Sequence, residues 1–173
     1  MSNEKNEQHL SEIEAETEIE TLEENRKAAI TLAKQARMSL DILTPDLEAT
    51  IYNNAEFERA VFDLVRRHRS TRIRILCRDC AEAVQQGHCL VRLAQTLTSA
   101  ISLHRLTEEY RHEQRSFLVA DRRGVLYRLQ AGSRNAQAVF SLNAPQRAAG
   151  LLDFFDDAWE HSEPDTQTRR LYV

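Results

Sequence analysis

The sequence predicts an α/β protein with a mixed, largely parallel β-sheet that carries helices on both faces. Strands are expected at 38–43 and 72–77, and between them 57–65 has the apolar i, i+3/i+4 stripe of an amphipathic helix. Strand, helix and strand at this spacing form a right-handed βαβ unit with parallel strands. Because helices and strands continue to alternate along the chain, we expect parallel pairing to dominate the sheet.

The other elements are read from the same periodicities. Thr21 and Glu24 form the capping box of the first helix, and Gly87 lies in the middle of a long one. The remaining elements are a helix from Glu23, a long helix over 83–97, strands at 101–106 and 138–142, a helix from Pro145 and an edge strand at 170–173.

Residues 115–130 are predicted to form a β-hairpin. Two apolar runs, 117–120 and 125–127, flank the polar segment 121–124, which contains Asp121 and ends in Gly124. A glycine shortly after an aspartate, between two β-rich runs, is a strong local signal for a tight hairpin turn.

The first 22 residues have a different composition from the rest. Residues 1–24 contain nine glutamates against Lys5, with few large apolar side chains. Such a segment cannot repay the entropy of ordering, so we expect a disordered acidic tail over 1–22 and a single domain over 23–173. The tail fits two roles, a solubilising leader or a mimic of nucleic acid that shields a basic groove.

Composition restricts the class of protein. The 173 residues suit one well-buried domain, and no apolar run approaches the roughly 20 residues of a membrane span. Without a secretory signal, and with three cysteines, we expect a cytoplasmic, bacterial-type protein without a disulfide framework or membrane insertion. No cofactor is expected.

Arginine dominates the basic residues. Beyond residue 24 the chain has 22 basic and 18 acidic side chains, and among the 23 basic residues of the whole chain 20 are arginine. Arginine suits bidentate contacts to phosphate or carboxylate, although GC-rich codon usage is the favoured explanation of the excess. The run from Arg66 to Arg74 is either a nucleic-acid patch or a solvated helix end beside its own negative dipole.

Cys77 and Cys80 form a CxxC between a predicted strand and a predicted helix, and His88 and Cys89 follow. A helix N-terminus stabilises a thiolate, and the four side chains are also candidate zinc ligands. The residue directly before Cys77 is Leu76 rather than an aromatic, and no second paired knuckle is present in the sequence, so the interpretation as ordinary buried cysteines is favoured.

Four segments of the chain point to one known family. They are the Arg-rich strand RIRILCRD, the strand pair RSFLVADRRGVLYRL, GSRN at 132–135, and the closing strand and helix with Phe155 and Trp159. On these segments residues 24–162 resemble a phospholipase D-like domain: the strand pair is similar to the one that carries the family's His-x-Lys-x4-Asp motif, and GSRN to its Gly-Ser-x-Asn.

In that family a histidine attacks phosphorus and a lysine two residues later on the same strand face binds the phosphate oxygens. With Asp121 as the motif's aspartate, Gln114 stands at the histidine position and Ser116 at the lysine position. Neither side chain can do that work, which indicates a pseudoenzyme. His112 shares the face, but choosing it as the nucleophile puts Gln114 in the lysine position. One motif copy also implies that activity requires a homodimer.

Without the nucleophilic histidine, the resemblance implies a polar cleft that binds a ligand and does not cleave it. Its candidate ligand-binding residues are Gln114, Ser116, Ser133 and Asn135, with Arg115 and His112 as cationic partners. The alternative is an ordinary polar strand end at the rim of the sheet, with Asp121 as a turn former.

We therefore expect a non-catalytic, homodimeric binding or interaction module whose ligand is nucleic acid or another phosphate-bearing group. The alternative is a structural or regulatory protein-interaction domain that uses the acidic tail or the helix with Phe155 and Trp159. Residual phosphodiesterase activity or a CxxC thiol or metal function is the third possibility.

Overall fold

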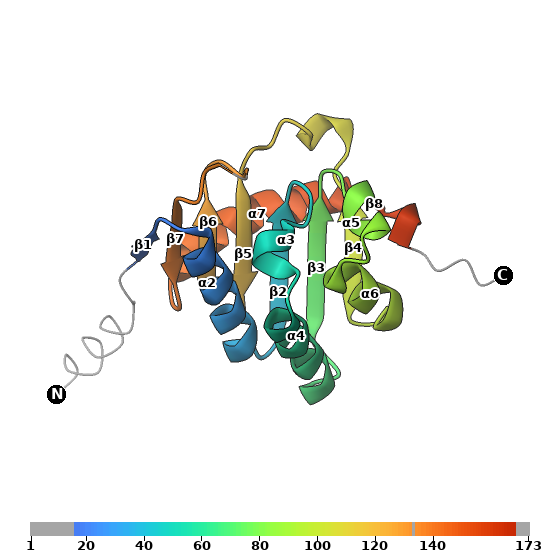
Figure 1. The fold of residues 1–173 in the computed structure, drawn as a ribbon, viewed down its shortest axis with the longest axis horizontal. Helices are drawn as coiled ribbons and strands as arrows, with labels where there is room; N and C mark the ends of the chain where they lie inside the picture. The colour runs from blue at the N-terminus through green and yellow to red at the C-terminus, as the bar shows by residue number, and fades with distance from the viewer. Residues whose placement is uncertain (1–15, 133, 169–173) are drawn as a thin grey trace.

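The computed structural model describes residues 16–132 and 134–168 (Figure 1). These residues form an eight-stranded sheet in the order β1-β7-β6-β5-β2-β3-β4-β8. The strands are β1 (Thr17–Ile19), β2 (Ser39–Thr44), β3 (Arg72–Cys77), β4 (Ile101–Arg105), β5 (Ser116–Ala120), β6 (Gly124–Arg128), β7 (Ala138–Ser141) and β8 (Glu163–Pro164). The helices are α2 (Leu22–Gln35), α3 (Ala49–Tyr52), α4 (Ala55–Arg67), α5 (Ala81–Gln85), α6 (Cys89–Thr96) and α7 (Pro145–Glu160), with 3₁₀ turns η1 (Glu108–Tyr110) and η2 (Thr166–Thr168).

The sheet is mixed, as predicted, but it is mostly antiparallel, so the prediction of a largely parallel sheet was wrong. Only the β2–β3 and β3–β4 pairs of the described sheet run parallel. The βαβ rule applies to this half because a helical crossover joins each pair. Beyond β4 the chain returns to the other side of β2, and short connections then join β5, β6 and β7, which forces antiparallel pairing.

Helices cover both faces of the sheet, as predicted. Helices α2 to α6 lie on the face toward the viewer of Figure 1, and α7 crosses behind it. Because strand side chains alternate, Leu40 and Ile42 of β2 belong to the core under α2 to α6, whereas Leu43 packs in the core under α7 with Phe155.

The domain begins earlier than the predicted boundary after residue 22. Thr17–Ile19 form β1 and pair antiparallel with β7, and Ile19 is buried. The predicted capping box is confirmed, since Thr21 Oγ1 accepts from the backbone N–H of Glu24 and the Glu24 carboxylate accepts from the N–H of Thr21. The predicted tail therefore loses residues 17–22 to the fold, and residues 1–15 lie outside the described part.

The predicted long helix over 83–97 is two helices. Gly87 has a φ of +68°, a left-handed conformation that ends α5, and His88 then caps α6 through its side chain. The edge strand expected at 170–173 falls outside the described residues. Among those described, β8 takes the edge position beside β4.

No helix in the described ranges has the length and apolar character needed to cross a membrane.

Candidate functional site

The predicted hairpin is confirmed as β5 and β6, which pair from Ser116–Arg128 to Ala120–Gly124. Asp121 and Arg122 form the turn with φ values of 52° and 60°. Two successive left-handed residues are the geometry of a type I′ turn, which matches the twist of the strands. The hairpin thus brings Ser116 and Arg128 side by side at one end of the sheet and Asp121 at the other.

Asp121 has a structural role in this position. Its carboxylate accepts hydrogen bonds from the backbone N–H groups of Arg37, Met38 and Ser39, at 2.8, 2.8 and 3.0 Å. These bonds tie the hairpin turn to the connection between α2 and β2. The aspartate of the predicted motif is therefore a loop anchor that lies at the far end of β5 from Ser116.

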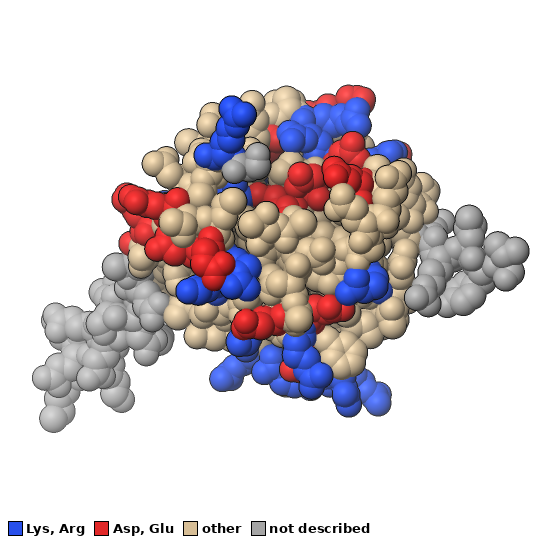
Figure 2. All heavy atoms as spheres, viewed as in Figure 1, with Lys and Arg blue, Asp and Glu red and all other residues tan. Residues whose placement is uncertain are grey.

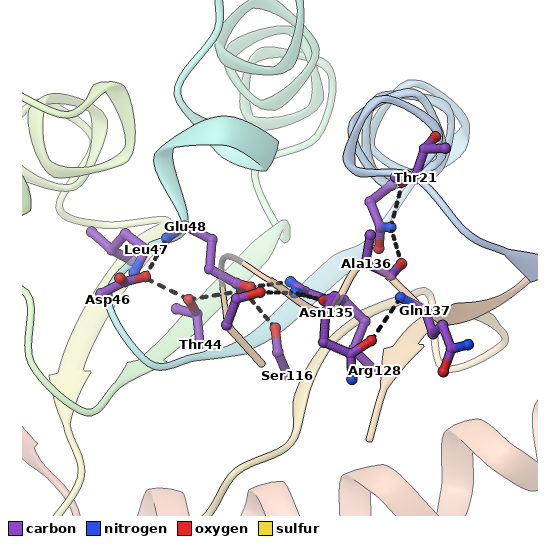
Figure 3. A network of polar contacts seen from close by, with 12 residues as sticks. Thr21, Thr44, Asp46, Leu47, Glu48, Ser116, Arg128, Asn135, Ala136 and Gln137 are labelled. Carbon is purple, nitrogen blue, oxygen red and sulfur yellow. Dashed lines mark hydrogen bonds and ion pairs between the residues drawn. The ribbon is translucent and has the colours of Figure 1, made fainter. Parts of the chain in front are cut away.

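Ser116 belongs to a buried polar network around Glu48 (Figure 3). Its Oγ donates to Glu48 Oε2 at 2.6 Å, and Thr44 Oγ1 donates to the same oxygen at 3.2 Å. Arg128 Nη1 donates to the other carboxylate oxygen, Glu48 Oε1. Arg128 is 2% exposed and Glu48 9%, so the pair is a salt bridge inside the protein.

The second half of the network holds the loop after β6. Arg128 Nη2 donates to the carbonyl oxygens of Gly132 and Asn135, at 3.1 and 2.7 Å. Its Nε has no hydrogen-bond partner in the described structure. The guanidinium therefore joins β6, the loop over 129–137 and the segment that follows β2.

Glu48 reaches the network through an unusual backbone. Leu47 and Glu48 both have positive φ, at 67° and 32°, which costs free energy in residues other than glycine. Thr44 compensates by accepting from the Leu47 N–H at 3.1 Å, and Leu47 is fully buried. The loop thus directs the Glu48 carboxylate into the sheet end rather than into solvent.

The arrangement has a direct chemical consequence. Serine, threonine and arginine donors around one point would suit a phosphate group, but the Glu48 carboxylate already accepts from all three. A pocket of about 250 Å³ lies next to this pair and is lined by Glu48, Arg128, Asp46, Glu82 and His88, among others. Three carboxylates at its wall make it a poor place for a second anion.

The other candidate site residues do not form one cleft. Gln114 is exposed and contributes its carbonyl oxygen to the N–H of Ala131 at 2.7 Å. Arg115 pairs with Glu113 and lies over the ring of Phe154 on α7, 4.5 Å from its centre. His112 is exposed, Asn135 meets Arg128 through its backbone oxygen, and Ser133 lies outside the described residues.

The CxxC region does not assemble the four-ligand set. Cys80 Sγ contacts Asp165 at 2.9 Å, whereas Cys89 Sγ donates to the carbonyl of Tyr52 at 3.2 Å. Within the described ranges no three histidine, cysteine or acidic side chains are grouped to hold a metal ion. A hydrogen bond with Cys80, together with burial, raises the pKa of the Cys77 thiol, and burial raises the pKa of Cys89 to about 11.

Sequence reasoning missed Glu48, Thr44 and Arg128 as parts of one network. Glu48 follows the C-terminal end of a parallel strand, and Arg128 interrupts an apolar strand pattern. A charged residue in a predicted buried strand is the signal that points to Arg128. Its partner lies 80 residues away, so no local pattern could identify it.

A family model, described as Domain of unknown function (DUF7931), matches residues 21–171. The chain belongs to this family. No relative was found among curated proteins. The matched span includes the hairpin and the whole Glu48–Arg128 network, so this network is part of the DUF7931 domain of this chain.

Solved structures share the fold at low sequence identity. TrmBL2, an archaeal chromatin protein with a novel mode of DNA binding, has 15% identity and a TM-score of 0.65, covering 95% of this chain and 63% of its own. Nuc from Salmonella typhimurium, a phospholipase D family member, has 13% identity and a TM-score of 0.63, covering 87% and 97%. NucT from Helicobacter pylori has 12% identity and a TM-score of 0.60, covering 87% and 99%. The fold is therefore phospholipase D-like, and this chain spans less than two thirds of TrmBL2.

Proposed function

We propose that this DUF7931 domain is a catalytically inactive phospholipase D-like module that binds a phosphate-bearing ligand, with nucleic acid as the preferred candidate. The observation that carries the loss of catalysis is the Glu48–Arg128 pair, which lies against Ser116 at the position that the resemblance gives to the phosphate-binding lysine. The Glu48 carboxylate already occupies the donors there and would repel a phosphodiester, so this sheet end does not cleave the ligand, which binds on another surface of the domain.

The nucleophile is missing as well. Gln114 has no titratable nitrogen, so it cannot form a covalent phosphoenzyme. His112 is exposed and takes no part in the hydrogen bonds of the Glu48–Arg128 network. This sheet end therefore has no nucleophile, and its arginine, Arg128, is already paired with Glu48. For these two reasons it does not support hydrolysis.

Two findings favour nucleic acid as the ligand class. The fold neighbours include a DNA-binding chromatin protein, and this domain shares that fold over 95% of its length. The arginine-rich composition also supplies the donors that contact phosphate oxygens. We propose in addition that the domain is a homodimer, which gel filtration tests, since a species near the monomer mass of 20.0 kDa would contradict it.

The function is tested by measuring binding and hydrolysis separately. We expect the purified protein to bind a labelled DNA duplex at low salt and to leave bis(p-nitrophenyl) phosphate intact at the rate of the buffer. Hydrolysis above that rate which persists in the purified His112→Ala variant would show a catalytic site elsewhere. Absence of binding to any duplex at low salt would remove the nucleic-acid proposal.

A further inference from the structure

The end of the sheet opposite the Glu48–Arg128 pair brings five connections together. Ser39 at the start of β2 pairs with Arg72 at the start of β3, and Leu40 pairs with Ala120 at the end of β5. Ile73 N–H donates to the carbonyl of Ala100, and Ala144 N–H to that of Arg123. The connections over 36–38, 68–71, 97–100, 121–123 and 142–144 therefore lie at one end of the molecule.

Seven exposed arginines belong to this end, which we call the basic end. They are Arg37, Arg66, Arg67, Arg69, Arg72, Arg122 and Arg123. Figure 2 shows Lys and Arg side chains gathered along the lower end of the molecule, beneath α4, whereas both charges occur together at the upper end. The five connections contain one acidic residue, Asp121, and its carboxylate is already bound by three backbone N–H groups.

The arginines of the basic end form no ion pairs within the described part of the chain. Among the described residues, none of the seven forms an ion pair with a carboxylate, although neighbouring Arg59 and Lys34 pair with Asp63 and Glu56. Arg67 and Arg72 donate to backbone carbonyls, and Arg66 lies over the ring of Phe62. Positive charge is therefore concentrated here with little internal compensation, the charge interaction of Arg122 with the buried Asp41 being the exception among the described residues.

Helix dipoles account for part of this cluster. Arg66 and Arg67 are in the last turn of α4, where a cation offsets the partial negative charge of the helix end. Arg37, Arg69 and Arg123 are exposed on three separate connections, and their guanidinium groups form no hydrogen bond, ion pair or ring contact with the described residues. Local stability does not explain these three, and their mutual repulsion favours an external anion.

The dimensions favour a polymer over a single small anion. The basic end extends across β6, β5, β2 and β3, which is about 14 Å at the usual spacing between strands. A DNA duplex presents about eight backbone charges over that length. Proteins that bind single strands stack the bases on exposed aromatic rings. Among the described residues, no exposed aromatic side chain lies beside these arginines.

We propose that the basic end contacts the phosphate backbone of double-stranded nucleic acid. This inference rests on the proposed function and adds the contact surface, which lies opposite the sheet end that the phospholipase D resemblance points to. Recognition is by backbone charge, so binding depends steeply on salt and weakly on base sequence. A single strand of equal length binds less tightly than the duplex.

The test uses the full chain and a labelled 20-base-pair DNA duplex, with fluorescence anisotropy over a series of salt concentrations. Arg37→Gln/Arg69→Gln/Arg123→Gln removes three charges from the basic end. The matched control, Arg105→Gln/Arg111→Gln/Arg134→Gln, removes three exposed charges from the opposite end. Thermal melting of both triple variants verifies that they fold, and lysine replacements at 37, 69 and 123 test whether charge alone restores binding.

We expect the basic-end triple to weaken binding at least tenfold at low salt and to lower the slope of log K against log salt by about 3. The control triple stays within about twofold of the wild type. Equal losses in both triples, or loss in the control alone, would overturn the basic end as the surface while leaving nucleic-acid binding intact. A wild-type protein that binds no duplex would overturn both.

Discussion

Removing the charge of Glu48 without changing its size should expose how much the domain depends on the buried pair. In Glu48→Gln, Arg128 keeps its charge at 2% exposure but loses its carboxylate partner, and it retains only neutral acceptors such as the carbonyl oxygens of Gly132 and Asn135. Breaking one side of a buried pair costs about 3–5 kcal/mol. For a chain of this length, that corresponds to a fall in Tm of about 6–20 °C.

Two further variants show whether that loss comes from the stranded charge. Glu48→Gln/Arg128→Met removes both charges and should recover most of the stability, since an apolar replacement of a buried pair is often neutral. Glu58→Gln breaks the exposed pair with Arg92, whose side chains are 33% and 53% exposed, and should cost less than about 1 kcal/mol. Urea unfolding at pH 7 measures all three. Equal losses in Glu48→Gln and Glu58→Gln would show that burial of the Arg128 charge does not cause the loss of stability.

Three further predictions concern other parts of the fold. Asp121→Ala leaves three backbone N–H groups without their acceptor and should cost about 2–4 kcal/mol in urea unfolding, whereas a catalytic aspartate would be stability-neutral. Burial lowers the pKa of His88, so as the pH falls this side chain is protonated in the unfolded chain before it is protonated in the folded protein. The stability that the neutral His88 contributes is therefore present above about pH 6.5 and should be lost as the pH drops below that value. The variant His88→Asn, which retains a capping side chain, should show a shallower fall in Tm between pH 7 and 5. Gln114→His/Ser116→Lys, which restores the two missing residue types, should remain inactive against bis(p-nitrophenyl) phosphate and lower Tm, because the introduced ammonium group would adjoin buried Arg128; turnover would contradict the view that the Glu48 pair closes the site.

Elements whose interactions join residues close in sequence could be predicted, and those that depend on residues far apart could not. The hairpin, the capping box of α2 and the β2–α4–β3 unit are encoded by neighbours in the sequence, and the structure confirms them. The parallel majority was wrong because strand direction beyond β4 depends on where the returning chain enters the sheet, and no local pattern encodes that choice. The break at Gly87 depends on one left-handed residue within an otherwise helical pattern.

The candidate site was harder to predict for the same reason. Ser116 was singled out from its motif position, but its partner Glu48 lies 68 residues earlier, on a loop whose left-handed backbone has no sequence signature of its own. Gln114 and Arg115 precede the first residue of β5, so strand alternation does not place them: Arg115 pairs with Glu113 and lies over Phe154 of α7, whereas Gln114 is exposed. The basic end was visible in the sequence as the run from Arg66, yet Arg37 and Arg123 join it only through the topology of the sheet.

The most direct test of the central claim measures binding and cleavage of the same DNA in one reaction. Plasmid DNA is incubated with an excess of the full chain at low salt, half of the sample is analysed for complex by gel shift, and the other half is stripped of protein and analysed for nicks. We expect complete complex formation and intact supercoiled DNA, with release of the DNA at high salt. Nicked or linear DNA that accumulates with time would contradict catalytic inactivity.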